Sequence, residues 1–590
     1  MYDLLNRINS PKDIKSLTNE ELDFLAKDVR DAVLNRVSKK GGHVGPNLGV
    51  VEATIALHYV FDFENDKLVF DVSHQCYPHK ILTGRKNGFI VDSELDTVSS
   101  YLNPKESAFD TFKVGHTSTS ISLATGMAKA RDLLGQTHNI VAFIGDGSLS
   151  GGEAFEGLNN AATIKGNFIV VVNDNEMSIA ENHGGLYSSL ADLRESNGKS
   201  SNNFFKTLGF DYVYEEKGND ISSLVETFKK VKDLNKPVVV HIHTIKGYGY
   251  LSAETSKELW HFRAPFNLES GELNSPSPKH TAVAVSEYLL NKAKIDKSVM
   301  VVTAATPGIC GLSKEVRDKL GKQYTDVGIA EEHAIAYVSG LAKSGAKPVA
   351  IFNSSFIQRT YDQLSQDLAL NGSPAVILVN RGGISAASAT HLGVFDIPLV
   401  SNIPNLVCLA PTSLEETLSV LDWAIDQKKH PVVIRLPILN NPEPISSISP
   451  FEFEQNKFNL TKSGDTVALV GLGNFFELAN QIAEELYLSF GISPSIINPL
   501  YYSGLDTELL EHLKNNHKLV VTLEDGVLDG GFGEKISRFY SSSDIKVLNF
   551  GANKEFTDDE PVGSIYERNS LTPAQIIQKI TRALNFNSNC

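Results

Sequence analysis

Several features that mark common protein classes are scarce in this chain of 590 residues. No apolar run approaches the roughly 20 residues needed to span a bilayer, and residues 1–7 contain no apolar signal core. The cysteines are few and match no paired metal-ligand or disulfide motif: Cys76, Cys310, Cys408 and Cys590. We therefore expect reduced thiols in a cytoplasmic protein that does not enter a membrane.

Positive charge is also in short supply. The 54 Lys and Arg residues stand against 70 Asp and Glu residues, which gives a formal charge of −16. That balance argues against nucleic acid and anionic membrane surfaces as partners. No short repeat and no low-complexity tract interrupts the chain, and its 42% hydrophobic and 21% charged residues are typical of a globular protein.

Short runs rich in Val and Ile alternate with amphipathic stretches along the chain. The runs are typical of strands buried on both faces, and the stretches 414–427 and 476–488 predict helices. This alternation predicts βαβ units and parallel sheets, hence an α/β fold. The predicted strands are 141–145, 168–173, 238–242, 299–304, 348–352, 375–379, 406–410, 432–436, 467–471, 494–498 and 519–523.

Two stretches rich in Pro, Ser and Asn, 264–280 and 440–465, lack periodicity and predict domain boundaries. Each segment between them is long enough for its own core. A third polar stretch, 181–204, is rich in Gly and Ser and predicts a mobile loop near the active site. The predicted domains are 1–270, 281–445 and 446–590, with 271–280 as a linker.

Two polar residues follow directly after predicted strands. Asp146 comes after the run 141–144, and Asn175 comes after the run 168–172. Hard oxygen ligands brought together at strand ends suit Mg²⁺ bound to a diphosphate. Gly145 and Gly147 let the backbone approach phosphate oxygens closely. Taken singly, the Asp would be read as a turn or cap residue and the Asn as an Asx turn; the joint pattern is typical of enzymes that use thiamine diphosphate (ThDP).

Longer motifs extend this interpretation over nearly the whole chain, which resembles the 1-deoxy-D-xylulose-5-phosphate synthase family of transketolase-like enzymes. The resemblance implies three domains with doubly wound, mostly parallel sheets, which bind in turn the diphosphate with Mg²⁺, the pyrimidine ring, and a second subunit. The motifs that carry it are GGHVGPNLG at 41–49, DVSHQCYPHK at 71–80, GHTSTS at 115–120, AEEH at 330–333, QRTYDQ at 358–363 and EDGVLDGGFG at 524–533.

The resemblance implies a transferase that decarboxylates pyruvate and joins the two-carbon unit to glyceraldehyde 3-phosphate. The product, 1-deoxy-D-xylulose 5-phosphate, feeds isoprenoid and thiamine biosynthesis. The family works as a homodimer with a large apolar interface, and its ThDP lies between the first and second domains.

The resemblance also assigns residues to the cofactor. Asp146, Asn175 and the Met177 carbonyl match the Mg²⁺ ligands. Phe356 matches the aromatic side chain that packs on the pyrimidine, although a buried Phe is more often core filler. Tyr250 matches a cofactor contact, with a plain edge-strand Tyr as the alternative. The remaining cofactor contacts are His74, Gly115, His116, Thr117, Gly147, Ser148, Asn175 and Glu331.

Three residues match the catalytic groups of the family. Glu331 would accept a hydrogen bond from the pyrimidine ring and so favour removal of the thiazolium proton. A carboxyl with this task should have a raised pKa, and the alternative role is a charge at the start of the helix 331–342. His43 and His391 would donate protons or hydrogen bonds to the condensing carbonyl, unless they are structural histidines.

The acceptor side departs from the family pattern. Arg359 and Arg381 remain as candidate contacts to the acceptor phosphate, but Asn353, Ser388 and Ile438 replace a Tyr, an Asp and an Arg of the family. Ile cannot provide the bidentate phosphate contact of an Arg. Three alternatives therefore stay open: a synthase with a modified pocket, a related carboligase with another acceptor, and a weakly catalytic paralogue that binds ThDP.

Overall fold

The computed structural model describes residues 2–276, 278–445 and 447–585. By its internal contacts the chain forms two compact units. The first unit holds residues 1–277 and 328–330, and the second holds residues 278–327 and 331–590. None of the helices in the described ranges is long and apolar enough to cross a membrane.

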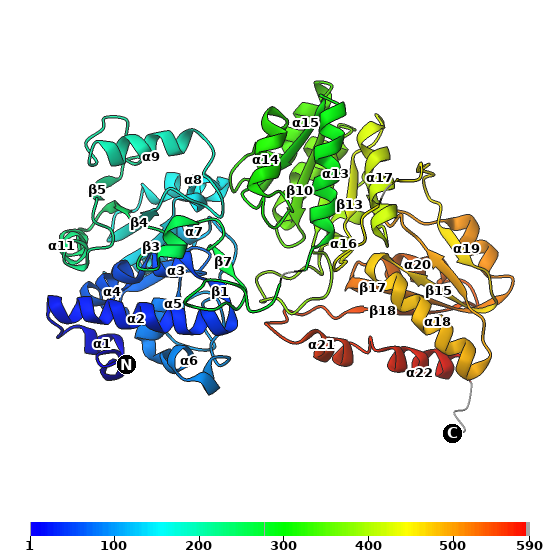
Figure 1. The fold of residues 1–590 in the computed structure, drawn as a ribbon, viewed down its shortest axis with the longest axis horizontal. Coiled ribbons are helices and arrows are strands. Elements are labelled where there is room, and N and C mark those ends of the chain that lie inside the picture. Colours follow the sequence, from blue (N-terminus) through cyan, green and yellow to red (C-terminus); the bar gives the residue numbers. More distant parts are fainter. Residues whose placement is uncertain (1, 277, 446, 586–590) are drawn as a thin grey trace. The chain divides into compact units, whose positions relative to one another are not determined.

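The first unit is built on a five-stranded parallel sheet in the order β2-β3-β4-β6-β5 (Figure 1). Its strands are β2 (Lys67–Phe70), β3 (Ile140–Gly145), β4 (Phe168–Asp174), β5 (Asp211–Glu215) and β6 (Pro237–His243). A separate antiparallel pair joins β1 (Gly42–His43) to β7 (Phe262–Arg263). The unit's helices are α1 (Pro11–Ile14), α2 (Asn19–Lys40), α3 (Gly45–Leu48), α4 (Val51–Val60), α5 (Tyr77–Lys80), α6 (Asn87–Ile90), α7 (Ser120–Leu133), α8 (Gly152–Ala161), α9 (Gly185–Glu195), α10 (Phe204–Leu208), α11 (Ile221–Val231) and α12 (Leu251–Thr255).

Helices cover both faces of this sheet, because alternate residues of each strand point to opposite sides. Val141 and Phe143 of β3 pack with α2, α4 and α11 in one apolar cluster. Ala142 and Ile144 pack with α7 and α8 in another. Burial on both faces explains why the central strands are continuous apolar runs in the sequence.

The second unit contains two sheets. A six-stranded parallel sheet has the order β12-β13-β11-β10-β8-β9, and a five-stranded sheet has the order β14-β16-β15-β17-β18 with only β14 antiparallel. The strands are β8 (Val299–Thr303), β9 (Tyr324–Asp326), β10 (Lys347–Asn353), β11 (Val376–Asn380), β12 (Val407–Leu409), β13 (Val432–Arg435), β14 (Asn459–Lys462), β15 (Thr466–Gly471), β16 (Ser495–Asn498), β17 (His517–Val527) and β18 (Lys546–Ala552).

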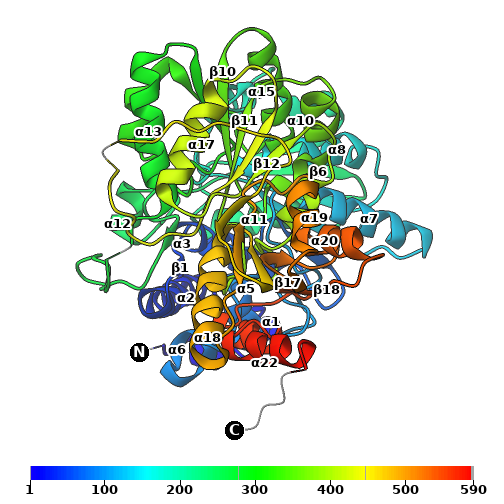
Figure 2. The ribbon, with the colours of Figure 1, turned by 90° about the vertical axis from the view of Figure 1, so that its right-hand side faces the viewer.

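One apolar cluster is shared by the two sheets of the second unit, and it includes α15, α16, α19 and α20. The opposite faces are covered by α13, α14 and α17 on the first sheet and by α18 and α22 on the second (Figure 2). The helices are α13 (Thr281–Ile295), α14 (Lys314–Leu320), α15 (Glu331–Lys343), α16 (Asp396–Ser401), α17 (Leu414–Asp426), α18 (Phe476–Phe490), α19 (Thr507–Leu513), α20 (Phe532–Tyr540), α21 (Val562–Arg568) and α22 (Pro573–Ala583).

The ends of the predicted helices have local causes. Ser413 caps α17, where its hydroxyl accepts from the Glu416 amide at 3.1 Å. Gly491 ends α18 in the left-handed conformation, with φ of 67°. All eleven predicted strands are present, and so are the three predicted helices, as α15, α17 and α18, so the α/β prediction is confirmed.

One predicted loop was wrong. The stretch 181–204 contains the helix α9, which begins at Gly185 and buries Leu190 and Leu193. The spacing of Leu186, Leu190 and Leu193 is helical, and the abundant Gly and Ser around them concealed it. The three cysteines in the described ranges, Cys76, Cys310 and Cys408, are buried free thiols, and Cys590 lies outside those ranges.

Candidate active site

The predicted metal ligands lie at the carboxyl ends of β3 and β4. These strands pair in parallel up to Gly145 and Asn173, so Asp146 and Asn175 follow at the same edge of the sheet. Both side chains are buried, with 1% and 9% of their surface exposed. Met177 forms an isolated bridge with Glu181 just beyond them.

This edge fits a divalent cation. Burial, followed by the charge of Asp174, raises the pKa of Asp146 to about 8, although the charge of Lys246 opposes this rise. The Oδ1 atom of Asn175 is buried and has no hydrogen-bond partner, so it is available as a ligand. No group of three or more His, Cys, Asp or Glu side chains suited to a metal occurs in the described ranges; the predicted set instead combines one carboxylate, one amide and one carbonyl.

Charged side chains also form hydrogen bonds next to this edge of the sheet. Asp174, at the end of β4, accepts from Arg194 Nη1 at 2.5 Å and lies 2.9 Å from His241 Nε2. Lys246 is 2% exposed and donates to the Ser178 carbonyl at 2.5 Å. Burial lowers the pKa of Lys246 to about 7.

The segment predicted as a mobile loop contacts the sheet edge that carries Asp146. Asn182 Nδ2 donates to Asp146 Oδ2 at 2.7 Å, and Tyr187 in α9 donates to the Asp146 and Gly147 carbonyls at 3.3 Å. Arg194 ties the end of α9 to Asp174. A Cβ on Gly147 would lie 3.0 Å from the Ser178 Cα, so a larger residue there would force Ser178 to shift.

Two of the predicted histidines meet, together with a third that the sequence analysis missed. The ring centroids of His43 and His74 are 5.0 Å apart, and His261 lies 5.5 Å and 5.3 Å from them. Asn47 fixes the two segments, because its Nδ2 donates to the carbonyls of His43 and His74 at 2.7 and 2.8 Å. Burial lowers the pKa of His261 well below 6.5.

Asp71 holds the loop that carries Gly115, His116 and Thr117. Its carboxylate is fully buried and accepts from the amides of Ser118 and Ser120 at 2.8 and 3.0 Å. Ser118 Oγ in turn donates to the Ser148 carbonyl at 2.8 Å, which joins this loop to the loop after β3. The loops with the predicted diphosphate contacts therefore form one hydrogen-bonded assembly.

Strained backbone accompanies this assembly. Val72 and Ser73 adopt φ of 58° and 65°, and Ser118 adopts φ of 75°. Such values are costly for a β-branched residue and persist only where surrounding contacts fix them. The Ser73 hydroxyl supplies one such contact, because it donates to the Val114 carbonyl at 2.6 Å.

Tyr250 lies in a local aromatic cluster. Its ring is 5.1 Å from that of Trp260, and its hydroxyl donates to the Leu268 carbonyl at 3.0 Å. These contacts would be sufficient for a purely structural role of Tyr250, so its contact with a cofactor stays a prediction.

In the second unit, Glu331 begins α15 and is 3% exposed. Burial raises the pKa of Glu331 to about 7, against the opposing charge of Arg359. Arg359 Nη1 lies 3.6 Å from Glu331 Oε2. The raised pKa expected of the catalytic carboxyl is present, and Arg359, predicted as an acceptor contact, lies beside that carboxyl.

Phe356 and His391 lie together, with ring centroids 5.6 Å apart in an edge-to-face arrangement. His391 Nδ1 is 2.9 Å from Thr390 Oγ1. The loop that carries His391 is also held by Asp558, whose carboxylate accepts from the Ala389 amide at 3.0 Å. A histidine in this setting has its ring orientation fixed by its own loop.

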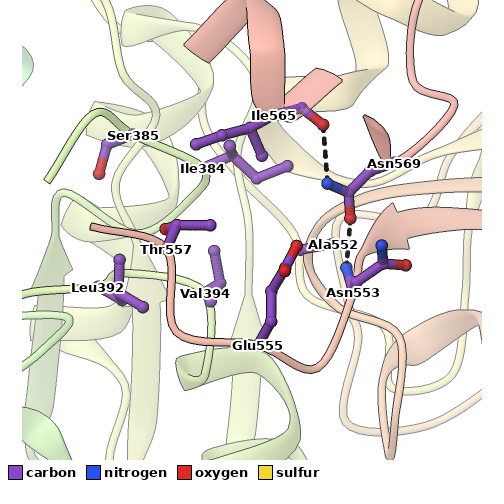
Figure 3. A pocket seen from close by; sticks show the side chains of 10 residues that line it. All are labelled: Ile384, Ser385, Leu392, Val394, Ala552, Asn553, Glu555, Thr557, Ile565 and Asn569. Atoms are coloured by element: carbon purple, nitrogen blue, oxygen red, sulfur yellow. Dashed lines mark hydrogen bonds between the residues drawn. The ribbon is translucent and has the colours of Figure 1, made fainter. Parts of the chain in front are cut away.

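A small pocket separates this loop from the chain after β18 (Figure 3). Leu392 and Val394 come from the segment after His391, and Ala552, Thr557 and Ile565 come from the end of β18 and the chain that follows it. Asn569 braces the far side, since its Nδ2 donates to the Ile565 carbonyl at 2.7 Å and its Oδ1 accepts from the Asn553 amide at 2.6 Å. The pocket is largely apolar and lies behind the His391 loop.

Few positively charged side chains on the predicted acceptor side are available to contact a phosphate. Arg381 follows β11, has φ of 56° and is exposed. Ile438 is 48% exposed, and Asn353 is buried with Oδ1 unpartnered. Arg435, which lies near these residues at the end of β13, is buried and forms ion pairs with Asp396 at 2.7 Å and with Asp525 at 2.6 Å.

The residues that the sequence analysis missed had signals in its own motifs. Asp71 lies in the motif at 71–80, and Lys246 begins the run that contains Tyr250. Their functions depend on burial and on partners distant in the sequence, which a motif does not show. His261 had no such signal.

Three family models match successive parts of the chain. Residues 5–201 and 197–244 match the family described as 1-deoxy-D-xylulose-5-phosphate synthase. Residues 277–443 match the pyrimidine-binding domain of transketolase, and residues 456–576 match its C-terminal domain.

Among curated proteins, the 1-deoxy-D-xylulose-5-phosphate synthase of Clostridium beijerinckii is 38% identical over 96% of this chain and 97% of its own length. That of Clostridium botulinum is 36% identical over 99% and 100%. Among solved structures, a transketolase variant from Pichia stipitis aligns over 97% of this chain and 98% of its own, with 16% identity and a TM-score of 0.44. The full-length sequence similarity shows that the chain belongs to the 1-deoxy-D-xylulose-5-phosphate synthase family of transketolase-like transferases.

Proposed function

We propose that this protein decarboxylates pyruvate with ThDP and joins the two-carbon unit to glyceraldehyde 3-phosphate, giving 1-deoxy-D-xylulose 5-phosphate. The observation that carries the proposal is Glu331, a buried carboxyl with its pKa raised to about 7 at the start of α15. The similarity to synthases over nearly the whole chain supports the choice of substrates.

We further propose that Asp146, Asn175 and the Met177 carbonyl hold Mg²⁺. The unpartnered Asn175 Oδ1 and the raised pKa of Asp146 support this set. His74, Gly115, His116, Thr117, Gly147 and Ser148 would contact the diphosphate, and Tyr250 and Phe356 the organic part of ThDP. When bound, ThDP supplies the carbon nucleophile that the protein side chains lack.

The protein's own groups would move protons. Glu331 can hold a proton near neutral pH, because burial raises its pKa. The charge of Arg359, 3.6 Å away, limits that rise and keeps the carboxylate accessible. We assign to His43 and His391 the donation of protons or hydrogen bonds to the substrate carbonyl, and to Arg381 the acceptor phosphate.

The assembly is part of the proposal. We propose domains at 1–270, 281–445 and 446–590 joined by the linker 271–280, two chains per active enzyme, and a cytoplasmic location. Light scattering of the purified protein should give twice the 64.4 kDa of one chain. A fully active monomer would contradict the homodimer.

One assay tests the function directly. Purified protein with ThDP, Mg²⁺ and pyruvate is offered a panel of phosphorylated and unphosphorylated aldehydes, and the products are identified by mass spectrometry. We expect 1-deoxy-D-xylulose 5-phosphate from glyceraldehyde 3-phosphate. Release of carbon dioxide from pyruvate without formation of that product would rule out the synthase assignment.

A second candidate function, a carboligase with another acceptor, is favoured by one observation. Arg435 is neutralised by Asp396 and Asp525, and Ile438 stands where the family has an Arg, so this side offers little charge for a phosphate. The aldehyde panel separates the two candidates.

A further inference from the structure

A single side chain of the C-terminal sheet holds two loops of the preceding sheet. Asn474 lies in a short 3₁₀ turn after β15, with Gly473 before it and Phe475 after it. Its Oδ1 accepts from the Ile438 amide at 2.8 Å. Its Nδ2 donates to Asp525 Oδ2 at 2.6 Å and, more weakly, to the Gly382 carbonyl at 3.2 Å.

Both loops belong to the proposed acceptor side. Gly382 directly follows Arg381, and Ile438 is the position at which the family has its second Arg. The bond to Ile438 is to the backbone amide, so it fixes the path of the chain whichever side chain the position carries. Asn474 thus joins two loops that the sequence separates by 56 residues, from 382 to 438.

Beneath Asn474 lies a buried ionic group. Arg435 donates to Asp396 through Nε and to Asp525 through Nη1, and all three side chains are at most 2% exposed. Asp525 therefore uses one oxygen on Arg435 and the other on Asn474. This arrangement is rigid, because separating any of these charges from its partner would leave a buried charge uncompensated, which is strongly destabilising.

The Arg381 turn is packed directly on this group. A Cβ on Gly382 would lie 2.5 Å from Asp396 Oδ2, and one on Gly383 would lie 2.3 Å from Asp525 Oδ2. Arg381 itself adopts φ of 56°, which an L residue holds only under constraint from its surroundings. The conformation of this turn is consequently set by contacts that Asn474 completes.

We propose that Asn474 is a positioning residue for the acceptor: it fixes the Arg381 turn and the Ile438 segment, and so sets acceptor affinity without taking part in the chemistry on pyruvate. The inference rests on the proposed function, because it concerns the acceptor side of that same site. It names a specificity determinant on the C-terminal sheet, outside the domain that carries the predicted acceptor residues.

The test compares Asn474→Ala with Asn498→Ala in the enzyme loaded with ThDP and Mg²⁺. Asn498 is a matched control, since it also joins the two sheets of the second unit: its Nδ2 donates to Glu416 Oε1 at 3.0 Å, and its Oδ1 accepts from the Leu500 amide at 3.0 Å. It contacts neither acceptor loop through these bonds. Both variants lose an Asn amide group between the same two sheets.

We expect the KM for glyceraldehyde 3-phosphate to rise about tenfold in Asn474→Ala, as for the loss of one well-placed hydrogen bond. The KM for pyruvate and the C2–H exchange of bound ThDP, followed by NMR, should match the wild type. Asn498→Ala should leave all three unchanged. Asn474→Ser, a milder change, should give an intermediate KM and serves if the Ala variant fails to fold.

A second measurement needs no turnover. Hydrogen–deuterium exchange at the Ile438 amide should accelerate in Asn474→Ala and not in Asn498→Ala, because only the first removes the acceptor of that amide. If the wild type makes no 1-deoxy-D-xylulose 5-phosphate, the proposed function fails while this exchange still tests the contact.

Three outcomes overturn the inference: an unchanged acceptor KM in Asn474→Ala, an equal rise in Asn498→Ala, or a parallel loss in ThDP C2–H exchange. The second would mean that the two sheets have merely loosened. The third would place Asn474 in the machinery of the donor reaction.

Discussion

The diphosphate side of the first unit and the acceptor side of the second unit differ in how their buried charges are paired. Around β3 and β4, Asn175 Oδ1 has no partner and Asp146 has a raised pKa, so ligand capacity is left open. Around β13, the charge of Arg435 is paired with Asp396 and Asp525, although Arg435 Nη2 and Asp396 Oδ1 are buried without a hydrogen-bond partner. A buried carboxyl such as Asp146 bears a desolvation cost that a bound cation would offset, whereas Arg435 already has two internal counter-ions.

The strongest way to break this comparison is to remove a proposed metal ligand. Asp146→Ala or Asn175→Ala should weaken binding of ThDP with Mg²⁺ roughly 100-fold or more, because even outer partners of a metal site cost 10–100-fold. Calorimetry with Asn160→Ala as the control checks this, since Asn160 is an exposed residue of α8 whose Nδ2 donates to the Glu156 carbonyl. Wild-type affinity in either ligand variant would end the metal assignment.

Glu331→Ala should lower the rate on the order of 10²–10⁴-fold, the usual contribution of a general acid or base. Cofactor affinity should change little, and so should the thermal midpoint measured at pH 5, where the Glu331 carboxyl holds its proton in the fold. NMR of C2–H exchange in bound ThDP measures the effect directly. Exchange at the wild-type rate would assign the proton transfer to another group.

The same carboxyl makes stability depend on pH. Its pKa is 4.5 in the unfolded reference and about 7 in the fold, so its contribution to stability is complete below about 4.5 and is lost as the pH rises through about 7. The loss amounts to about 3 kcal/mol at 1.36 kcal/mol per unit. Urea unfolding of the cofactor-free protein at pH 5 and pH 8 should show this decline, and Glu331→Gln should reduce it; an identical decline in both proteins would refute the assignment.

A smaller effect sharpens the acceptor half of the comparison. Ile438→Arg should lower the KM for glyceraldehyde 3-phosphate about tenfold, since an exposed Arg restores a bidentate phosphate contact. An unphosphorylated aldehyde should gain nothing, and Ile438→Leu is the matched control. If the wild type already has a low KM for glyceraldehyde 3-phosphate and Ile438→Arg does not change it, then other residues bind the phosphate and the prediction is wrong.

Much of the fold was predictable because central strands are buried on both faces. The runs that became β3, β4 and β6 are continuous apolar segments, as burial on two faces requires. The strands that escaped prediction in the three main sheets all lie at sheet edges: β2, β5, β9, β14 and β18. An edge strand packs less and tolerates polar residues, so its sequence does not distinguish it from a loop.

The sequence by itself determined the α/β class, and it was enough to propose Asp146 and Asn175 as metal ligands and Glu331 as the catalytic carboxyl, because each proposal depends on residue type within a short motif. Only the tertiary structure decided that Arg435 forms ion pairs with two aspartates and that Arg359 lies beside Glu331. It likewise decided that Asn474 accepts a hydrogen bond from the Ile438 amide. Those facts depend on contacts between residues far apart in the chain and on their burial. The same charged side chain is a ligand group or an internal counter-ion according to which partners the fold brings to it.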